Sequence, residues 1–249
     1  MQLAMERAFI AAKIDWRYLT LDVTPDRLAS AFAGMQSLGF RGAHLTGAHR
    51  LNAIEHLAHA DETAKLARWV DCLSVTGSGL VGHNRWGNTI RRLVGEPVDD
   101  HCVVIYGDDP SVLAIGFELL AAGWSNIYFD GMEREIAAKY CERLAIQSSS
   151  GKNRWSPLTR AVIIGESADT GMLLNKQKLA RLSANSLVLD LSHMGSFSKV
   201  TRTAESLQLR AVSGLETLMR YTCETFAAWT GVNAETQLLR ESLEEYYEI

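Results

Sequence analysis

Two patterns of hydrophobic and polar positions alternate along the chain. Short runs of β-branched and aromatic residues predict strands, and apolar residues that recur every three or four positions predict helices. In the first hundred residues we expect strands at 16–23, 42–46 and 70–75, helices at 28–38 and 52–66, and a turn at 77–79.

From residue 101 the predicted strands become continuously apolar, as in His101–Tyr106. Such runs are typical of parallel strands that are buried on both faces of a sheet. Strands alternating with helices indicate an α/β fold with a small first domain, a nucleotide-binding-type second domain and C-terminal helices. The further elements are helices at 111–122, 133–144, 176–182, 214–229 and 235–246, strands at 126–129, 161–164 and 186–191, and a polar loop at 147–156.

The composition is that of a globular protein and excludes several classes of function. Of the 249 residues, 47% are hydrophobic and 22% are charged, and the formal net charge is −4. This charge provides no basic surface for nucleic acid or an anionic membrane, and no apolar stretch is long enough to cross a bilayer. Residues 1–9 carry charges where a signal peptide would be apolar. The four cysteines lack a C-x-x-C spacing, so we expect reduced, mostly buried thiols in a cytoplasmic protein, without disulfides or a zinc site.

A series of short motifs runs in order along the chain. They are Trp16-Arg17-Tyr18-Leu19, Leu38-Gly39-Phe40-Arg41-Gly42, His44-Leu45-Thr46, His49-Arg50, Asp61-Glu62-Thr63-Ala64, Leu80-Val81-Gly82-His83-Asn84, Gly214-Leu215-Glu216 and Phe226-Ala227-Ala228-Trp229-Thr230-Gly231. In this order and at these spacings, they resemble the shikimate dehydrogenase family. The resemblance covers nearly the whole chain and is strongest in residues 15–90 and 212–245.

The resemblance implies a particular domain organisation and reaction. Residues 1–92 would form an N-terminal α/β substrate domain, which the C-terminal helices at 222–249 complete, and residues 93–221 would form a Rossmann-type domain. The family reaction is the NADP-linked interconversion of 3-dehydroshikimate and shikimate in aromatic amino acid biosynthesis. NADP and a small-molecule ligand are therefore expected by resemblance only.

Both catalytic positions of the family are substituted in this chain. The family lysine closes an N-V-T-x-P-x-K loop, and residues 44–50 read HLTGAHR there, so that Arg50 replaces the lysine. Arginine stays protonated at neutral pH and cannot shuttle a proton. The family aspartate ends an N-T-D triplet, which reads Asn84-Arg85-Trp86 here, so that an indole replaces the carboxylate.

The positions that bind the substrate in the family are partly retained. Thr46 and Asn84 are kept, whereas Asp71 stands at the family's asparagine and Tyr221 at its glutamine. The paired serines that hold the substrate carboxylate in the family would fall at or before Met1. The resemblance thus assigns these four retained or substituted residues to substrate binding.

The cofactor loop differs from the family as well. After the first strand of the second domain, the family's G-A-G-G reads Gly107-Asp108-Asp109-Pro110. Glycines there let the backbone approach a pyrophosphate at a helix N-terminus, whereas aspartates repel phosphate and proline lacks an N–H donor. After the next strand, Asp130 stands where the family has an arginine motif, and an acidic residue suits a ribose diol, as in NAD binding. Gly107, Asp109 and Asp130 are the predicted cofactor positions.

Each of these assignments has a simpler alternative. Arg50 can bind a carboxylate or form a structural ion pair with Asp71. Trp86 can fill the former substrate site or stack on a ligand. His49 or His83 can act as a replacement acid or be an ordinary hydrogen-bonded histidine.

Three hypotheses for the function follow. The first is a pseudoenzyme, a shikimate dehydrogenase homologue with little or no such activity that is kept as a binding or scaffold protein, its site plugged by Trp86, Tyr221 and Arg50. The second is an active NAD(P)-dependent oxidoreductase for a different small hydroxy acid. The third is a part of a larger multidomain shikimate-pathway polypeptide, with a fused or associated domain such as a 3-dehydroquinate dehydratase.

Overall fold

The chain folds into two compact units of the α/β class. A computed structural model describes residues 1–146, 154–166, 168, 176–193 and 198–248. Unit 1 comprises Met1–Thr89 and Met219–Ile249, and unit 2 comprises Ile90–Leu218. The boundaries expected from the sequence, at 92/93 and 221/222, differ from these by a few residues. The chain passes from one unit to the other within α5 (Arg85–Val94) and α11 (Gly214–Thr230).

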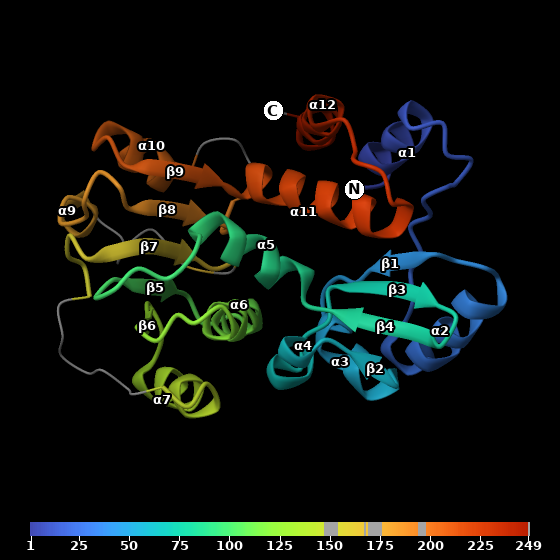
Figure 1. Cartoon of the computed structure of the whole chain (residues 1–249), viewed down its shortest axis with the longest axis horizontal. Helices are drawn as coiled ribbons and strands as arrows, with labels where there is room; N and C mark the ends of the chain where they lie inside the picture. Colours follow the sequence, from blue (N-terminus) through green and yellow to red (C-terminus); the bar gives the residue numbers. More distant parts are fainter. Residues whose placement is uncertain (147–153, 167, 169–175, 194–197, 249) are drawn as a thin grey trace. The chain divides into compact units, whose positions relative to one another are not determined.

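Unit 1 is built on a four-stranded sheet with the order β1-β3-β4-β2 (Figure 1). β1 (Gly42–His44), β3 (Cys72–Thr76) and β4 (Gly79–His83) are antiparallel neighbours, and β2 (His59–Ala60) runs parallel to β4. The helices of unit 1 outside the two connecting helices are α1 (Gln2–Ala11), η1 (Pro25–Arg27), α2 (Leu28–Ser37), α3 (His49–Asn52), η2 (Ala53–His56), α4 (Glu62–Ala67) and α12 (Thr236–Tyr247).

The core of unit 1 follows the helical pattern that predicted α2. Leu28, Phe32 and Met35 recur at helical spacing, and all three are buried. They belong to the same apolar cluster as Leu73 of β3 and Leu80 of β4. Because an amphipathic helix gains most of its stability by burying its apolar stripe, this packing fixes α2 against the sheet.

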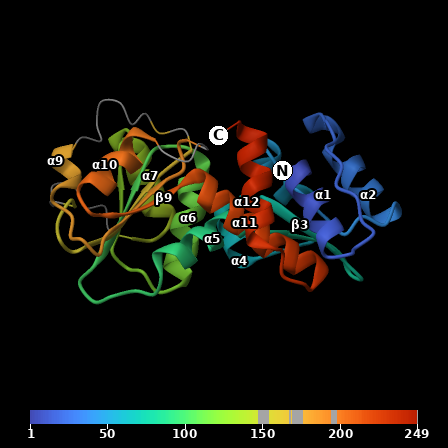
Figure 2. The same cartoon turned by 90° about the horizontal axis from the view of Figure 1, so that it is seen from above.

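The C-terminal helix returns to unit 1, as the resemblance predicted. α12 lies beside α1, which the views in Figures 1 and 2 both show. Leu239 and Leu243 of α12 are fully buried, and Arg7 of α1 forms an ion pair with Glu245 at 2.7 Å. The two leucines supply most of the stabilisation, since exposed ion pairs contribute little.

Two predictions in the first domain are wrong. Residues 16–23 form no strand, because no neighbouring strand pairs with them, and they remain without regular secondary structure. Residues 52–66 are not one helix, because the chain becomes extended at Leu57 so that His59 and Ala60 can pair with Val81 and Gly82 of β4. Tertiary pairing here overrides the local helical pattern.

Unit 2 contains a five-stranded parallel sheet with the order β6-β5-β7-β8-β9. This topology confirms the Rossmann-type fold, and every residue of β5 is buried, as the continuous apolar run predicted. The elements are β5 (Cys102–Tyr106), α6 (Pro110–Ala121), β6 (Ile127–Asp130), α7 (Arg134–Arg143), β7 (Thr159–Ile164), α9 (Lys176–Leu179), β8 (Leu187–Asp190), α10 (Lys199–Ser206) and β9 (Arg210–Ser213).

Several elements of the structure have no counterpart in the sequence prediction. They are α1, β4, α5, α10 and β9. The predicted loop at 147–156 lies mostly outside the described residues. Across the described part of the chain, no helix is both long enough and apolar enough to cross a membrane.

Candidate functional site

Asp71 is the centre of a buried polar cluster in unit 1. It precedes β3 directly and is only 2% exposed. Its Oδ2 accepts hydrogen bonds from the indole Nε1 of Trp69 and from the backbone N–H of Trp86, both at 3.1 Å. Its Oδ1 is buried without a hydrogen-bond partner. The carboxyl group is therefore satisfied on one oxygen only.

Burial dominates the acidity of Asp71. Removal of the carboxylate from water raises its pKa from the ordinary 3.8 to about 6, against the opposing effects of the Trp86 amide, the Arg50 charge and the Trp69 indole. With a pKa of about 6, roughly half of the molecules carry this proton at pH 6 and about a tenth carry it at pH 7. Carboxyl groups with a raised pKa are able to act as acids at that pH.

Arg50, at the position of the family lysine, lies beside this cluster. Its Nε donates to the backbone carbonyl of Leu45 at 3.1 Å, and its guanidinium lies over the Trp69 ring, 5.2 Å from the centroid. Its positive charge lowers the pKa of Asp71. Arg50 is thus held by backbone and aromatic contacts, which position it as a fixed cation rather than a proton donor.

Trp86 and Tyr221 pack on each other around Asp71. Their rings meet edge to face at a centroid distance of 5.5 Å, and each side chain is only 5% exposed. The Tyr221 hydroxyl donates to the backbone carbonyl of Asp71 at 3.1 Å, whereas the Trp86 Nε1 is buried without a partner. Burial raises the pKa of Tyr221 well above its usual value, so its hydroxyl stays protonated.

His44 extends the cluster through aromatic contacts. Its ring lies 5.1 Å from Tyr221 and 4.7 Å from Trp229, and its Nδ1 is 2.8 Å from the Tyr18 hydroxyl. Burial, together with the nearby charges of the N-terminus and Arg50, lowers the pKa of His44 to about 3. The imidazole is therefore neutral at physiological pH, and its Nε2 is buried without a partner.

The two retained substrate positions of the family differ in this structure. Asn84 is buried, and its Oδ1 accepts the backbone N–H of Gly87 at 3.1 Å, which satisfies one of the free amides at the start of α5. Thr46 is exposed, and its carbonyl accepts the His49 N–H in the turn before α3. Of the positions that the resemblance assigns to the site, Asp71, Trp86 and Tyr221 therefore contact one another, whereas Thr46 is exposed to solvent.

The two histidines considered as replacement acids have structural partners. His49 Nε2 is 2.7 Å from the backbone carbonyl of Val23. His83 lies between Asp61, at 3.1 Å from Nδ1, and the Ser74 hydroxyl, at 3.0 Å from Nε2. Within the described residues, no group of three or more His, Cys, Asp and Glu side chains is arranged to hold a metal ion. All four cysteines are free, and three of them are buried, as expected.

In unit 2, Asp109 fills the end of the sheet where dinucleotides bind in Rossmann folds. The chain order places the switch point between β5 and β7, whose carboxyl ends lead to Gly107 and Gly165. Asp109 is the N-cap of α6, and its Oδ1 accepts the Ser111 N–H at 3.0 Å and contacts the Ser111 hydroxyl. Its Oδ2 lies where a Cβ on Gly165 would be. A carboxylate therefore occupies the helix N-terminus that would otherwise attract phosphate.

Asp130, at the end of β6, is held by three groups of the same unit. Its Oδ2 accepts the Trp155 indole N–H at 2.9 Å and lies 3.4 Å from the Lys178 Nζ, and its Oδ1 accepts the Gly131 N–H at 2.9 Å. Burial alone would raise the pKa of this carboxyl, but the Trp155 and Gly131 hydrogen bonds and the Lys178 charge outweigh burial and lower it.

These contacts do not fit a bound dinucleotide. The Asp130 oxygens that would bind a ribose diol already accept two N–H groups and contact a lysine, and Lys178 also lies over the rings of Trp155 and Tyr106, at 5.1 and 5.7 Å. At the α6 N-terminus, Pro110 contributes no N–H and Asp109 adds a negative charge. The sequence predicted that Asp109 would repel phosphate and that Asp130 would suit a ribose diol. It did not identify Trp155 or Lys178, because neither belongs to a recognisable motif.

Comparison with known proteins agrees with the motif series. Residues 3–73 match the family model for the shikimate dehydrogenase substrate binding domain. The chain is 24% identical to a shikimate dehydrogenase (NADP(+)) of Methanocaldococcus jannaschii over 95% of this chain and 88% of that protein. It is 26% identical to a shikimate dehydrogenase (NADP(+)) of Moorella thermoacetica over 96% of this chain and 86% of that one.

The fold comparison extends to crystal structures. Shikimate 5-dehydrogenase of Thermus thermophilus, in complex with shikimate, superposes with a TM-score of 0.81 at 18% identity and covers all of this chain and 94% of its own. The ligand-free 5-ketofructose reductase of a Gluconobacter strain gives a TM-score of 0.83 at 22% identity, covering 98% and 93%. The class is thus a two-domain α/β protein with a Rossmann-type sheet. Within that class the chain is similar in sequence to the shikimate dehydrogenases over nearly its whole length, and the predicted resemblance is confirmed.

Proposed function

We propose that this protein is a shikimate dehydrogenase homologue without shikimate dehydrogenase activity, retained as a binding or scaffold protein. The observation that carries the proposal is the packing of Trp86 and Tyr221 around Asp71. Three positions that the family uses for its substrate or its chemistry here contact one another, through two hydrogen bonds to Asp71 and a ring contact between Trp86 and Tyr221. No proton donor stands at the Arg50 position, because arginine does not release a proton at neutral pH.

The arrangement in unit 2 supports the same proposal independently. Transfer of a hydride from a nicotinamide requires that the pyrophosphate be held at the α6 N-terminus. Asp109 places a carboxylate there, and Asp130 is engaged by Trp155 and Lys178. Loss of a single catalytic group typically costs a few kcal/mol of transition-state stabilisation, and several losses at both sites leave little of the family reaction.

A second candidate function is that of an active oxidoreductase on a different small hydroxy acid or sugar. It is favoured by Asp71, whose raised pKa of about 6 and unpartnered Oδ1 suit a general acid. The fold similarity to a 5-ketofructose reductase is consistent with this second candidate function. In this function Asp71 would donate the proton in place of the family lysine.

Dinucleotide binding separates the two candidates. NADPH and NADH would be titrated into the protein and followed by nicotinamide fluorescence, with and without shikimate. We expect no saturable binding of either up to millimolar concentration. Saturable binding at micromolar concentration would contradict the first candidate and would direct a rate assay to shikimate and 5-ketofructose.

The second candidate has its own control in the Asp71→Asn variant. If turnover were found, an acid role for Asp71 requires that the variant lose it while retaining cofactor affinity. The pH profile of the wild type would also fall through a pKa near 6. Turnover that is unchanged in the variant would exclude Asp71 as the acid.

A further inference from the structure

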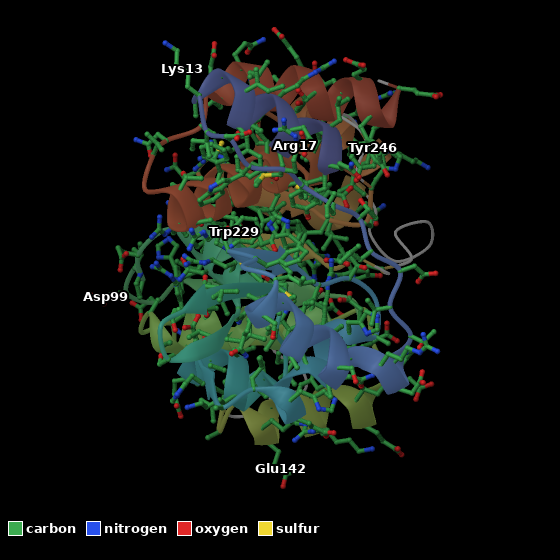
Figure 3. All side chains as sticks on the ribbon, turned by 90° about the vertical axis from the view of Figure 1, so that its right-hand side faces the viewer. Lys13, Arg17, Asp99, Glu142, Trp229 and Tyr246 are labelled. Atoms are coloured by element: carbon green, nitrogen blue, oxygen red, sulfur yellow. The ribbon has the colours of Figure 1, made fainter. Side chains whose placement is uncertain are left out.

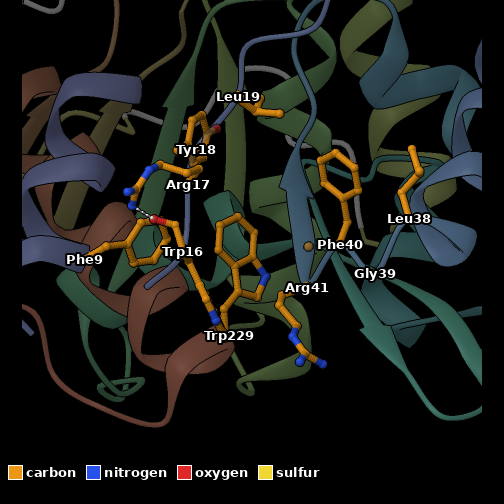
Figure 4. A pocket seen from close by; sticks show the side chains of 11 residues that line it. Phe9, Trp16, Arg17, Tyr18, Leu19, Leu38, Gly39, Phe40, Arg41 and Trp229 are labelled. Atoms are coloured by element: carbon orange, nitrogen blue, oxygen red, sulfur yellow. Dashed lines mark hydrogen bonds between the residues drawn. The ribbon is translucent and has the colours of Figure 1, made fainter. Parts of the chain in front are cut away.

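Unit 1 contains a hollow between two stretches of chain, residues 16–19 and residues 38–42. Its volume is about 380 Å³, and Figure 4 shows it from close by. On one side lies the segment that the sequence predicted as a strand, and on the other the approach to β1, with Trp229 of α11 between them. Its lining residues are Phe9, Trp16, Arg17, Tyr18, Leu19, Leu38, Gly39, Phe40, Arg41, Gly42 and Trp229.

The outer edge of β1 is unpaired. β1 is the terminal strand of its sheet, and its neighbour β3 pairs with it on one side only. The bonds from Val75 N to Arg41 O and from Leu45 N to Asp71 O show that residues 41, 43 and 45 face β3. The backbone groups of Gly42 and His44 therefore point to the other edge, where no described residue bonds to them.

The opposite wall is equally incomplete. The sequence of residues 16–23 is typical of a strand, yet no strand pairs with it. Tyr18 N–H bonds to the Glu6 carboxylate, whereas the peptide groups of Arg17 and Leu19 bond to no other described residue. Backbone groups without partners among the described residues, at Arg17 and Leu19 on one side and at Gly42 on the other, thus border one hollow, and His44 continues the free edge of β1. An added strand pairs with such groups.

The side chains around the hollow indicate the character of such a strand. Leu38 is 77% exposed and Leu19 is 56% exposed, so apolar side chains are presented to solvent at the rim. The charged residues of the lining are Arg17 and Arg41, with no acidic residue among them. Arg17 makes a 3.6 Å contact with Asp15 outside the hollow, and Arg41 lies over the Trp16 ring. Figure 3 faces this side of unit 1, with Arg17 and Trp229 labelled.

We propose that this hollow binds an extended, acidic peptide segment of a partner protein, which adds a strand between residues 16–19 and the free edge of β1. Backbone hydrogen bonds to Gly42 and His44 would hold it, apolar side chains would cover Leu19 and Leu38, and a carboxylate would meet Arg41. The inference goes beyond the proposed function and uses none of the dinucleotide positions.

The test uses a blocked eight-residue peptide of alternating valine and threonine with two glutamates at one end. Binding would be followed by tryptophan fluorescence, since Trp16 and Trp229 line the hollow, and by amide hydrogen exchange measured by NMR. We expect saturable binding together with slowed exchange at Gly42 and His44. A peptide with lysines in place of the glutamates should bind at least tenfold more weakly.

Two further controls separate strand addition from non-specific contact. The same peptide with alternate backbone nitrogens methylated keeps its side chains but cannot pair on one edge, and it should not protect the two amides. The Leu38→Asp and Arg41→Glu variants should each weaken binding at least tenfold, whereas Leu158→Asp, at a 49% exposed leucine of unit 2, should not.

Several outcomes would overturn the proposal. They are absence of protection at Gly42 and His44, equal binding of the methylated peptide, and equal affinity in the Arg41→Glu variant. Protection that appears without peptide and rises with protein concentration, together with a dimer in sedimentation, would assign the edge to a second copy of this chain instead. The dinucleotide titration tests unit 2, whereas the peptide titration tests unit 1. Failure of the proposed function can therefore be distinguished from failure of this proposal.

Discussion

Asp71 in unit 1 and Asp130 in unit 2 are two carboxyl groups taken partly or wholly from water, and their pKa values shift in opposite directions. Asp71 is nearly completely buried, with one oxygen bonded and one without a partner, and its pKa rises to about 6. Asp130 is less buried, has partners on both oxygens and a lysine nearby, and its pKa falls. Burial raises the pKa of a carboxyl unless hydrogen bonds and opposite charge compensate for it.

The contrast distinguishes two ways in which a site can be closed. In unit 2 the acidic group forms a satisfied network, which contributes to stability and leaves no reactive group. In unit 1 the acidic group is held in an incompletely satisfied environment, which costs stability and leaves a titratable proton. Buried carboxyl groups with strongly shifted pKa values are found at functional sites more often than elsewhere in proteins.

The largest expected effect is at Asp71. Its folded pKa of about 6 lies above the ordinary 3.8, so stability is greatest below pH 4, falls as the pH rises to 6, and stays low above that. Ionisation of this group therefore costs about 3 kcal/mol at pH 7. The Asp71→Asn variant should be more stable than the wild type by about 2 kcal/mol at pH 7 and about equal to it at pH 4, by urea unfolding.

The control for this profile is the exposed Asp26→Asn variant of the same unit, which should leave the pH dependence unchanged. Equal slopes for the wild type and Asp71→Asn between pH 4 and pH 7 would mean that folding does not raise the pKa of Asp71. The contrast with Asp130 would then rest on geometry alone.

The next largest effect is the difference in stability between substitutions of two buried tryptophans. Trp155 and Trp86 are both 5% exposed, but the Trp155 N–H donates to Asp130 while the Trp86 N–H has no partner. Replacing each by phenylalanine removes a similar volume, and only Trp155→Phe removes a hydrogen-bond donor from a carboxylate. Because hydrogen bonds to charged groups contribute about 1.5–3 kcal/mol, Trp155→Phe should destabilise by about 2 kcal/mol more than Trp86→Phe. Equal losses in thermal unfolding would show that both indoles act by packing alone.

The sequence allowed the second domain to be predicted more fully than the first. Continuous apolar runs such as 101–106 identify parallel strands, because a strand covered on both faces has no polar side chains. β9 was missed because Arg210 and Ser213 interrupt its apolar pattern at an edge of the sheet. In the first domain, residues 16–23 have strand-like side chains without a partner, and pairing is a property that no local pattern reports.

The candidate site was predicted in its positions but not in its contacts. Motif spacing located Arg50, Asp71, Trp86 and Tyr221, which the structure brings together. It gave no sign that Asp71 would accept the Trp69 indole and the Trp86 amide, since these bonds depend on side-chain orientation after the turn into β3. Asp109 as an N-cap was within reach of the sequence, because an aspartate before proline at a helix start is a capping signal.

A smaller effect of opposite sign is expected at Asp130. Its pKa is lowered, so its contribution to stability is present above the unfolded carboxyl pKa near 4 and is lost as the pH falls through the folded value. Its side chain is 31% exposed, and screening reduces the contribution to about 1 kcal/mol. Asp130→Asn should therefore destabilise the protein by that amount at pH 7 and progressively less as the pH falls below 4. A stabilised variant at pH 7, measured by urea unfolding, would place Asp130 in the same class as Asp71.

The smallest effect on stability, with the clearest effect on binding, is expected for Asp109→Ser. Serine caps helices about as well as aspartate, so the unfolding free energy should change by less than about 0.5 kcal/mol. The substitution removes the carboxylate from the α6 N-terminus, where the helix dipole favours an anion. Weak NADPH binding, in the millimolar range, should therefore appear in the variant and be absent from the wild type. Identical titrations of both proteins would mean that Asp109 is not the obstacle, and that the network around Asp130, with Trp155 and Lys178, closes the site by itself.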